Sequence, residues 1–132
     1  MLKVDLHAHT ADDPSEFIPH TAWDLIDRPA ELGYQALAIT LHDKQLDVAP
    51  LMSYAGDLGL SIIPGIERSI HGRHLLFINC PPEVEAVQSF EEVAQLKARW
   101  GVSSLRHIRS IQPCTGYKTC WMPMRCSSMP SK

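Results

Sequence analysis

Short apolar segments alternate with helix-patterned segments along the first hundred residues. Apolar runs with the length and composition of strands occur at residues 2–6, 36–40, 60–66 and 73–79. Helical spacing of apolar residues separates the first three runs, and another helical pattern follows the fourth. The expected order is β-α-β-α-β-β-α, and this alternation predicts a mostly parallel sheet of α/β type.

Capping residues mark the ends of the expected helices. Thr21, with Asp24 three residues later, predicts the start of the first helix. Pro29 conflicts with that helix, because an internal proline removes a hydrogen bond and costs about 3 kcal/mol. We therefore expect the helix to kink or to end early. Ser89 and Glu92 predict a capping box for the third helix.

Two histidines follow the first expected strand, in the string VDLHAHT. His7 and His9 are two residues apart, and residues i and i+2 of an extended chain point to the same side. Neutral imidazole is the commonest metal-binding side chain, and Asp5 lies close enough to orient or join the pair. This motif alone fits a pair of histidines that bind nothing equally well.

Further residues of metal-binding type lie at the ends of the other expected strands. His42 follows the second strand, Glu67 follows the third, and His74 begins the fourth. Side chains with chemical roles gather at the carboxyl ends of strands in parallel α/β folds. Alone, His42 could be a loop histidine, Glu67 a solvated acid and His74 a core histidine. Their recurrence at corresponding places predicts one cluster that includes His7 and His9.

Imidazole and carboxylate together suit Zn, Mn or Fe, and a bridging carboxylate allows two ions to lie a few ångströms apart. Such a cluster lowers the pKa of bound water and neutralises a phosphoryl oxygen. These are the requirements for phosphoester hydrolysis without a protein nucleophile. No catalytic side chain besides the metal ligands is therefore predicted.

Four strings in this order, VDLHAHT, ALAITLHD, IIPGIE and GRHLLFIN, resemble the motifs of the PHP (polymerase and histidinol phosphatase) superfamily. The resemblance covers about residues 3–101. It implies a distorted TIM-like barrel, present here only in part, that holds two to three divalent metals and hydrolyses phosphoesters. It also implies that His7 and His9 bind the first metal, that Glu67 bridges to the second, and that His74 binds the second.

The same resemblance implies a third metal site that contains His42. An acid after the first motif usually completes that site, and Asp13 or Asp12 could supply it, with His20 as an alternative. Arg68 and Arg73 are candidate phosphate contacts, with ordinary surface charges as the alternative interpretation.

The chain departs from the family pattern in two places. The second motif commonly has Asp before its His, whereas this chain has Leu41 there and Asp43 after it. The family's later motifs, a histidine on a middle strand and an Asp-x-His pair, are absent. The chain has about half the usual length of the domain.

The last thirty residues differ in composition from the rest. Residues 1–102 carry all 15 acidic and seven of the 12 basic residues, whereas residues 103–132 carry five basic residues and no acid. Three cysteines in this segment have a spacing that fits no familiar zinc site. We expect residues 1–102 to be the N-terminal part of a PHP-type domain and residues 103–132 to be an irregular basic tail.

A shifted reading frame offers one origin for the tail. Shifted by one nucleotide, residues 104–112 can encode A-P-P-H-P-F-Y-P, which supplies the missing middle histidine. In the same frame, residues 120–123 must encode Leu-Asp-Ala, whichever codons are used. The alternative is a genuine basic tail that contacts nucleic acid or an acidic partner.

Three functions remain open at this point. The first is metal-dependent phosphoester hydrolysis, with a phosphorylated small molecule or a nucleic-acid end as substrate. The second is a non-catalytic remnant of such an enzyme, and the third is a metal hydrolase of amidohydrolase type, a class that also opens with His-x-His after a strand. Because the sequence contains no apolar run of about 18 residues and no signal peptide, we expect no membrane partner and a cytoplasmic location. The sequence indicates no oligomeric state.

Overall fold

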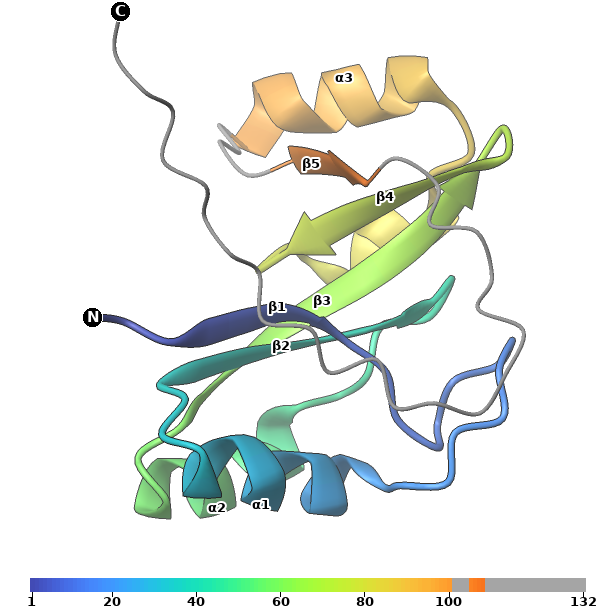
Figure 1. The fold of residues 1–132 in the computed structure, drawn as a ribbon. Helices are drawn as coiled ribbons and strands as arrows, with labels where there is room; N and C mark the ends of the chain where they lie inside the picture. The colour runs from blue at the N-terminus through green and yellow to red at the C-terminus, as the bar shows by residue number, and fades with distance from the viewer. Residues whose placement is uncertain (101–104, 109–132) are drawn as a thin grey trace, which may run out of the picture.

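A curled sheet of five strands organises the protein (Figure 1). The computed structural model describes residues 1–100 and 105–108. The strands lie side by side in chain order. They are β1 (Val4–Ala8), β2 (Ala36–His42), β3 (Ser61–Ile70), β4 (Arg73–Ile78) and β5 (Leu105–Ile108).

Strands β1, β2 and β3 are parallel, and β4 and β5 continue the sheet in antiparallel pairing. The helical elements are α1 (Ala22–Glu31), α2 (Ala49–Asp57), the short 3-10 helix η1 (Pro82–Ala86) and α3 (Phe90–Trp100). The expected α/β order of strands and α-helices is therefore confirmed.

Strand β5 is an element that the sequence did not predict, since it falls within the expected irregular tail. Four residues are too few for a period of two to be recognised, and this strand is defined by its pairing with β4. The rest of the tail, with its cysteines and the frameshift hypothesis, lies outside the described residues. The domain boundary at residue 102 stays a prediction.

The predicted cap of α1 is confirmed. The Thr21 hydroxyl accepts a hydrogen bond from the Asp24 backbone N–H, and the Asp24 carboxylate accepts one from the Thr21 backbone N–H. Pro29 lies in the last turn, and the helix ends two residues later. At α3 only half of the predicted box forms. Ser89 Oγ accepts from the Glu92 N–H, but the Glu92 carboxylate accepts from Gln88 N–H instead of from Ser89.

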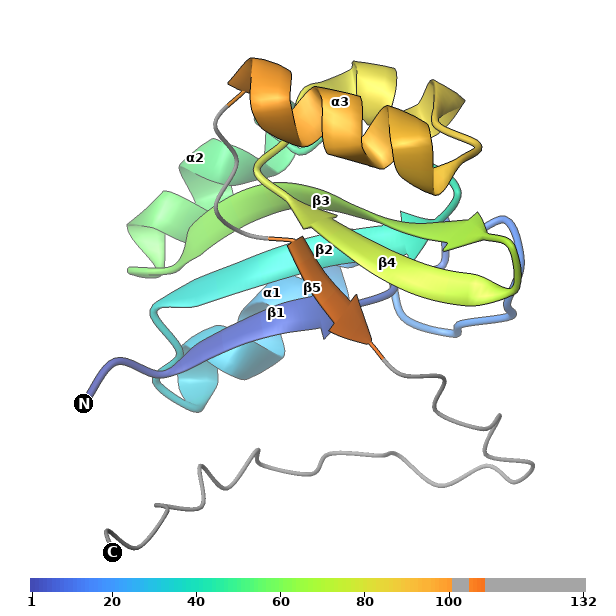
Figure 2. The ribbon, with the colours of Figure 1, turned by 90° about the horizontal axis from the view of Figure 1, so that it is seen from above.

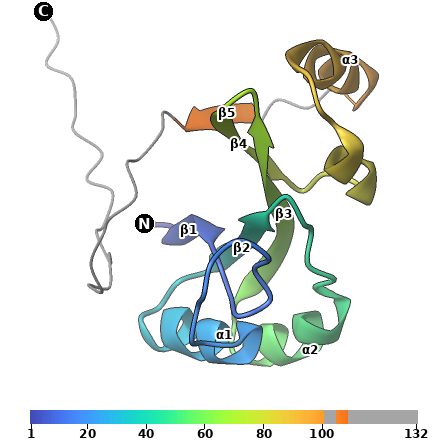
Figure 3. The same ribbon diagram turned by 90° about the vertical axis from the view of Figure 1, so that its right-hand side faces the viewer.

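The helices lie along the convex side of the curled sheet (Figure 3). Helices α1 and α2 pack on the parallel strands through one apolar cluster. A second apolar cluster joins β3 and β4 to η1 and α3. Figure 2 shows α3 on the same side of the sheet as this cluster, over β3 and β4. The largest fully buried apolar side chains are Ile26, Leu37, Ile39, Leu41 and Leu60 in the first cluster, and Ile66, Ile70 and Phe77 in the second.

Alternation along β2 separates the apolar core from the polar face of the sheet. Leu37, Ile39 and Leu41 face the helices and are fully buried. Thr40 and His42 therefore face the concave side. Leu41 stands where the PHP motif commonly has Asp. The alternation explains this difference, because a side chain at that position packs in the core and not among the polar groups.

Candidate metal centre

The six residues predicted to bind metal come together on the concave side of the sheet, near the carboxyl ends of β1, β2 and β3. Their potential ligand atoms form three overlapping groups, and the atoms of each group lie within 4.8 Å of one another. Four imidazoles and two carboxylates make up the donor set, which fits a divalent transition metal. The groups are His7–His9–Glu67, His9–Asp13–His42 and His42–Glu67–His74.

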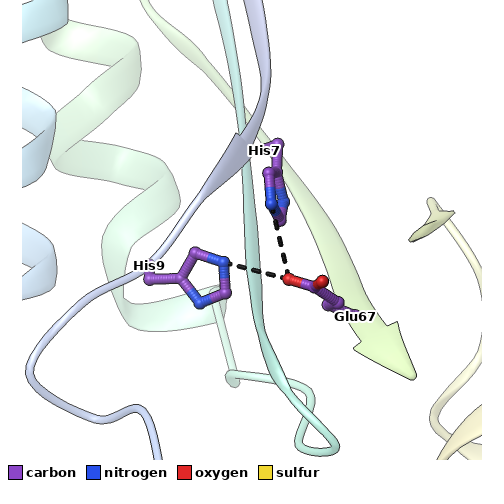
Figure 4. Close-up of side chains that lie close together, drawn as sticks. All are labelled: His7, His9 and Glu67. Carbon is purple, nitrogen blue, oxygen red and sulfur yellow. Dashed lines mark ion pairs between the residues drawn. The ribbon is translucent and has the colours of Figure 1, made fainter. Parts of the chain in front are cut away.

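Glu67 is the centre of this cluster, and Figure 4 shows His7 and His9 pointing at its carboxylate. Its Oε2 lies 3.4 Å from Nε2 of His7 and 3.2 Å from Nε2 of His9. His42 Nε2 lies 3.7 Å from the same oxygen, and His74 Nδ1 contacts Oε1. One buried carboxylate thus faces four imidazoles.

Strand geometry places these side chains. His42 pairs with Glu67 across β2 and β3, and paired residues share a face. His74 on β4 pairs with Ser69 on β3, and Ser69 lies two residues after Glu67. The His74 side chain is therefore on the same side of the sheet as that of Glu67. The expectation that His7 and His9 point to one side is also met, since their ring centroids lie 4.8 Å apart.

The surroundings keep Glu67 ionised. Burial by itself raises its pKa, but hydrogen bonds from His9 and His74 and the nearby His7 and His42 outweigh burial and lower the pKa to about 2. Burial lowers the pKa of His7. For His9, hydrogen bonds to Glu67 and Asp13 overcome burial and raise the pKa. The carboxylate is therefore charged, and His7 is neutral, at neutral pH.

Asp13 connects the loop before α1 to the cluster. Its Oδ2 lies 2.7 Å from His9 Nδ1 and accepts a hydrogen bond from the His42 backbone N–H at 2.9 Å, while its Oδ1 accepts from the N–H of Ser15 and Glu16. Its side chain is fully buried. Despite burial, these hydrogen bonds hold its pKa well below the usual range.

The two alternatives to Asp13 lie elsewhere. Asp12 is exposed, and its carboxylate accepts a hydrogen bond from the Thr10 hydroxyl. The His20 ring donates from Nε2 to the backbone carbonyl of His9. The structure therefore brings Asp13, and neither Asp12 nor His20, to the ring nitrogens of His9 and His42.

The group that contacts the His7 ring differs from the expected one. Asp5 Oδ1 accepts a hydrogen bond from the His7 backbone N–H, so it supports the strand and not the imidazole. Thr40 Oγ1 lies 2.8 Å from His7 Nδ1. Sequence reasoning missed Thr40, although its position two residues before His42 on the same strand face was the available signal.

Arg68, one of the two candidate phosphate contacts, points away from the cluster. Residues 67 and 68 are neighbours within β3 and point to opposite faces. The Arg68 guanidinium donates to Asp43 Oδ1 at 2.6 Å and to the Val87 carbonyl at 2.6 Å, on the side of α3. Its charge is therefore used within the fold.

Arg73, the other candidate phosphate contact, lies on the face of the sheet opposite to the cluster. It pairs with Ile70 in the β3–β4 ladder, and Ile70 belongs to the apolar cluster under α3. Its neighbour His74 points to the opposite side, toward Glu67. The structure thus gives neither arginine a position from which it contacts the cluster.

Asp43 holds the ends of β2 and β3 together. It adopts a positive φ of 51°, a conformation that Asp tolerates better than most residues. Its N–H donates to the Glu67 carbonyl at 2.8 Å, and its Oδ1 accepts from Ser69 N–H as well as from Arg68. These hydrogen bonds hold the segment next to His42 against the part of β3 that carries Glu67.

Comparison with known proteins gives a match among solved structures. No protein-family model and no curated protein matches the chain. An amidohydrolase from Chromobacterium violaceum, solved with bound sulfate and no metal, superposes with a TM-score of 0.51 at 25% sequence identity. The match covers 73% of this chain and 32% of that one, so this chain spans about a third of the enzyme's length. The likeness supports a partial TIM-like barrel.

The described part of the chain contains no helix that could span a membrane. None of the helices there combines the length and the apolar character that a membrane span requires.

Proposed function

We propose that this chain is the N-terminal part of a metal-dependent hydrolase that acts on phosphoesters. The observation that carries the proposal is the convergence of four imidazoles on the buried, ionised carboxylate of Glu67. The solved amidohydrolase with a similar fold supports a metal hydrolase in general. The four motifs that resemble the PHP superfamily favour phosphoesters as the substrate class.

Two of the three ligand groups can be filled at the same time. His7–His9–Glu67 and His42–Glu67–His74 share only Glu67, and a carboxylate has two oxygens with which to bridge two ions. Zn, Mn or Fe suits this mixture of donors. We therefore propose two divalent ions that share Glu67.

The role of Asp13 in this arrangement depends on the number of bound ions. With two ions bound, it accepts hydrogen bonds from Nδ1 of His9 and of His42, which leaves Nε2 of each ring directed toward Glu67. With three ions, Asp13 and His42 would hold the third, as the family resemblance implies. Counting the bound metal separates the two arrangements.

Divalent ions in this centre would supply an activated water molecule and would neutralise charge on a phosphoryl oxygen. The chain itself keeps Glu67 ionised and directs the imidazoles at it. Because Arg68 and Arg73 face away, we propose that they take no part in binding phosphate. The substrate would be a phosphorylated small molecule or a nucleic-acid end, and a cytoplasmic location stays a prediction.

The proposal is tested by metal analysis and hydrolysis assays on the full chain. We expect two bound ions after loading with Zn²⁺ or Mn²⁺, and turnover of bis(p-nitrophenyl) phosphate that a chelator abolishes. Absence of stoichiometric metal would contradict the proposal. Metal binding without turnover of any tested substrate would support a non-catalytic remnant.

A hydrolase acting on amides is the second candidate, and the name of the structurally similar protein favours it. An anilide substrate assayed beside the phosphodiester separates the two. Hydrolysis of the amide without hydrolysis of the phosphodiester would replace the first proposal by the second.

A further inference from the structure

We infer that Thr40 is a positioning residue that sets the tautomer of His7 and thereby directs the Nε2 lone pair of this imidazole into the cluster. The inference rests on the proposed metal centre. It assigns a role to a residue that offers no metal ligand itself and that no motif argument singled out.

The hydrogen bonds of Thr40 define the direction of donation. Its Oγ1 lies 2.8 Å from His7 Nδ1 and 3.4 Å from the backbone carbonyl of Ala8. We assign the hydroxyl proton to the bond with Ala8, whose carbonyl oxygen only accepts. The hydroxyl oxygen then accepts from Nδ1–H, which requires His7 to carry its proton on Nδ1.

The opposite edge of the ring is directed at the carboxylate. His7 Nε2 lies 3.4 Å from Glu67 Oε2, a longer separation than the one between Nδ1 and Thr40. An imidazole that binds a metal is neutral, so one ring nitrogen carries the proton and the other keeps a lone pair. With the proton on Nδ1, that lone pair is on Nε2, where a metal shared with His9 and Glu67 needs it.

Packing leaves Thr40 little freedom to turn away. The residue is fully buried, and β-branching restricts its first side-chain torsion. It pairs with Gly65 on β3. A Cβ at Gly65 would lie 2.8 Å from Thr40 Cγ2, so the glycine provides the room for the Thr40 methyl group.

Two variants separate the hydroxyl from the shape of the side chain. Thr40→Val keeps the branched shape and removes the oxygen, whereas Thr40→Ser keeps the oxygen. Partners of metal-binding histidines contribute roughly 10- to 100-fold to metal affinity. We expect the Kd for Zn²⁺, measured with a competing chelator on the full chain, to rise by about that factor in Thr40→Val. It should stay close to wild type in Thr40→Ser.

The tautomer provides a readout that does not depend on metal. Long-range ¹H–¹⁵N correlation spectra of the metal-free chain at pH 7.5 distinguish a protonated from an unprotonated ring nitrogen. We expect His7 to be protonated on Nδ1 in the wild type and in Thr40→Ser. In Thr40→Val that preference should be lost.

The outcomes separate this inference from the proposed function. A wild-type His7 protonated on Nε2 overturns the inference, whether or not Thr40→Val folds. Equal Zn²⁺ affinity and equal tautomer in all three proteins also overturns it. Failure of the wild type to bind Zn²⁺ contradicts the proposed function, while the tautomer comparison still decides the role of Thr40.

Discussion

His42 and Glu67 lie opposite each other on the parallel strands β2 and β3, with Nε2 of the histidine 3.7 Å from Oε2 of the glutamate. The hydrogen bond from Asp43 N–H to the Glu67 carbonyl fastens this register at its end. A slip of one residue would turn the Glu67 side chain to the helix face. The cluster therefore depends on strand pairing as much as on the identity of its residues.

Replacement of Glu67 by Gln should abolish the bridging carboxylate while keeping its shape. We expect Zn²⁺ affinity to fall by at least about 100-fold, beyond the range seen when only an outer partner is lost. The same competition titration measures it. Glu83→Gln, a matched change at an exposed position of η1, should leave the affinity unchanged. Equal affinity in both variants would show that Glu67 is not a ligand.

Replacement of Arg68 by Met should reduce stability. The change removes one of the two donors to Asp43 Oδ1 and leaves the Val87 carbonyl without the Arg68 donor. Because the Asp43 side chain is 39% exposed, we expect a loss of about 1–3 kcal/mol, less than for a fully buried pair. Urea unfolding measures the loss. Arg73→Met, at an exposed position of β4, should change the free energy of unfolding by less than about 0.5 kcal/mol.

The same pair of variants tests whether Arg68 acts in the fold or contacts phosphate. If Arg68 contacted phosphate, Arg68→Met would raise KM for a phosphodiester without a loss of stability. That result for Arg68→Met would contradict its assignment to the fold.

Replacement of Gly65 by Ala should destabilise the protein. The new Cβ would lie 3.1 Å from the Phe77 carbonyl oxygen and 3.2 Å from that of Ile39, besides its contact with Thr40. Backbone atoms on both sides must shift, so we expect a cost of about 1–3 kcal/mol. Gly56→Ala is the control, because its Cβ meets nothing within 4 Å in α2 and should stabilise by about 0.5–1 kcal/mol. Unchanged unfolding of Gly65→Ala would refute the tight packing between β2 and β3.

Acid should weaken the metal-free fold. The pKa of Glu67 is lowered from 4.5 to about 2 in the folded chain, so its contribution is complete above pH 4.5 and is lost as the pH falls toward 2. The lowered pKa of Asp13 acts in the same direction. Urea midpoints in the presence of a chelator should therefore decrease between pH 5 and pH 2.5. Glu67→Gln should flatten this dependence, and a parallel decrease in both proteins would assign the effect to other acids.

Several local features could be predicted because they depend on neighbours in the chain. The spacing of His7 and His9 places both on one side of an extended segment, and Thr21 with Asp24 forms the predicted cap. The alternation of apolar segments predicted the order of the strands and α-helices from β1 to α3 for the same reason, although it did not predict η1.

The position of Arg68 shows how strand length affects which face a side chain takes. The sequence predicted the end of the third strand at Ile66, which left Glu67 and Arg68 in a loop where both could face one site. Pairing with β4 extends β3 to Ile70, and alternation within the longer strand sends the two side chains to opposite faces. The length of a strand depends on its partner, which its own sequence does not describe.

The sequence by itself determined the strand and helix order and the residue types of the centre, since periodicity, capping and i, i+2 spacing act over a few residues. Tertiary structure decided that Asp13 and not Asp12 joins the cluster, that Thr40 contacts the His7 ring, and that Glu67 is central. Each of those contacts crosses between strands or loops. Register and packing, which arise only when the sheet assembles and curls, are the physical reason that they could not be read along the chain.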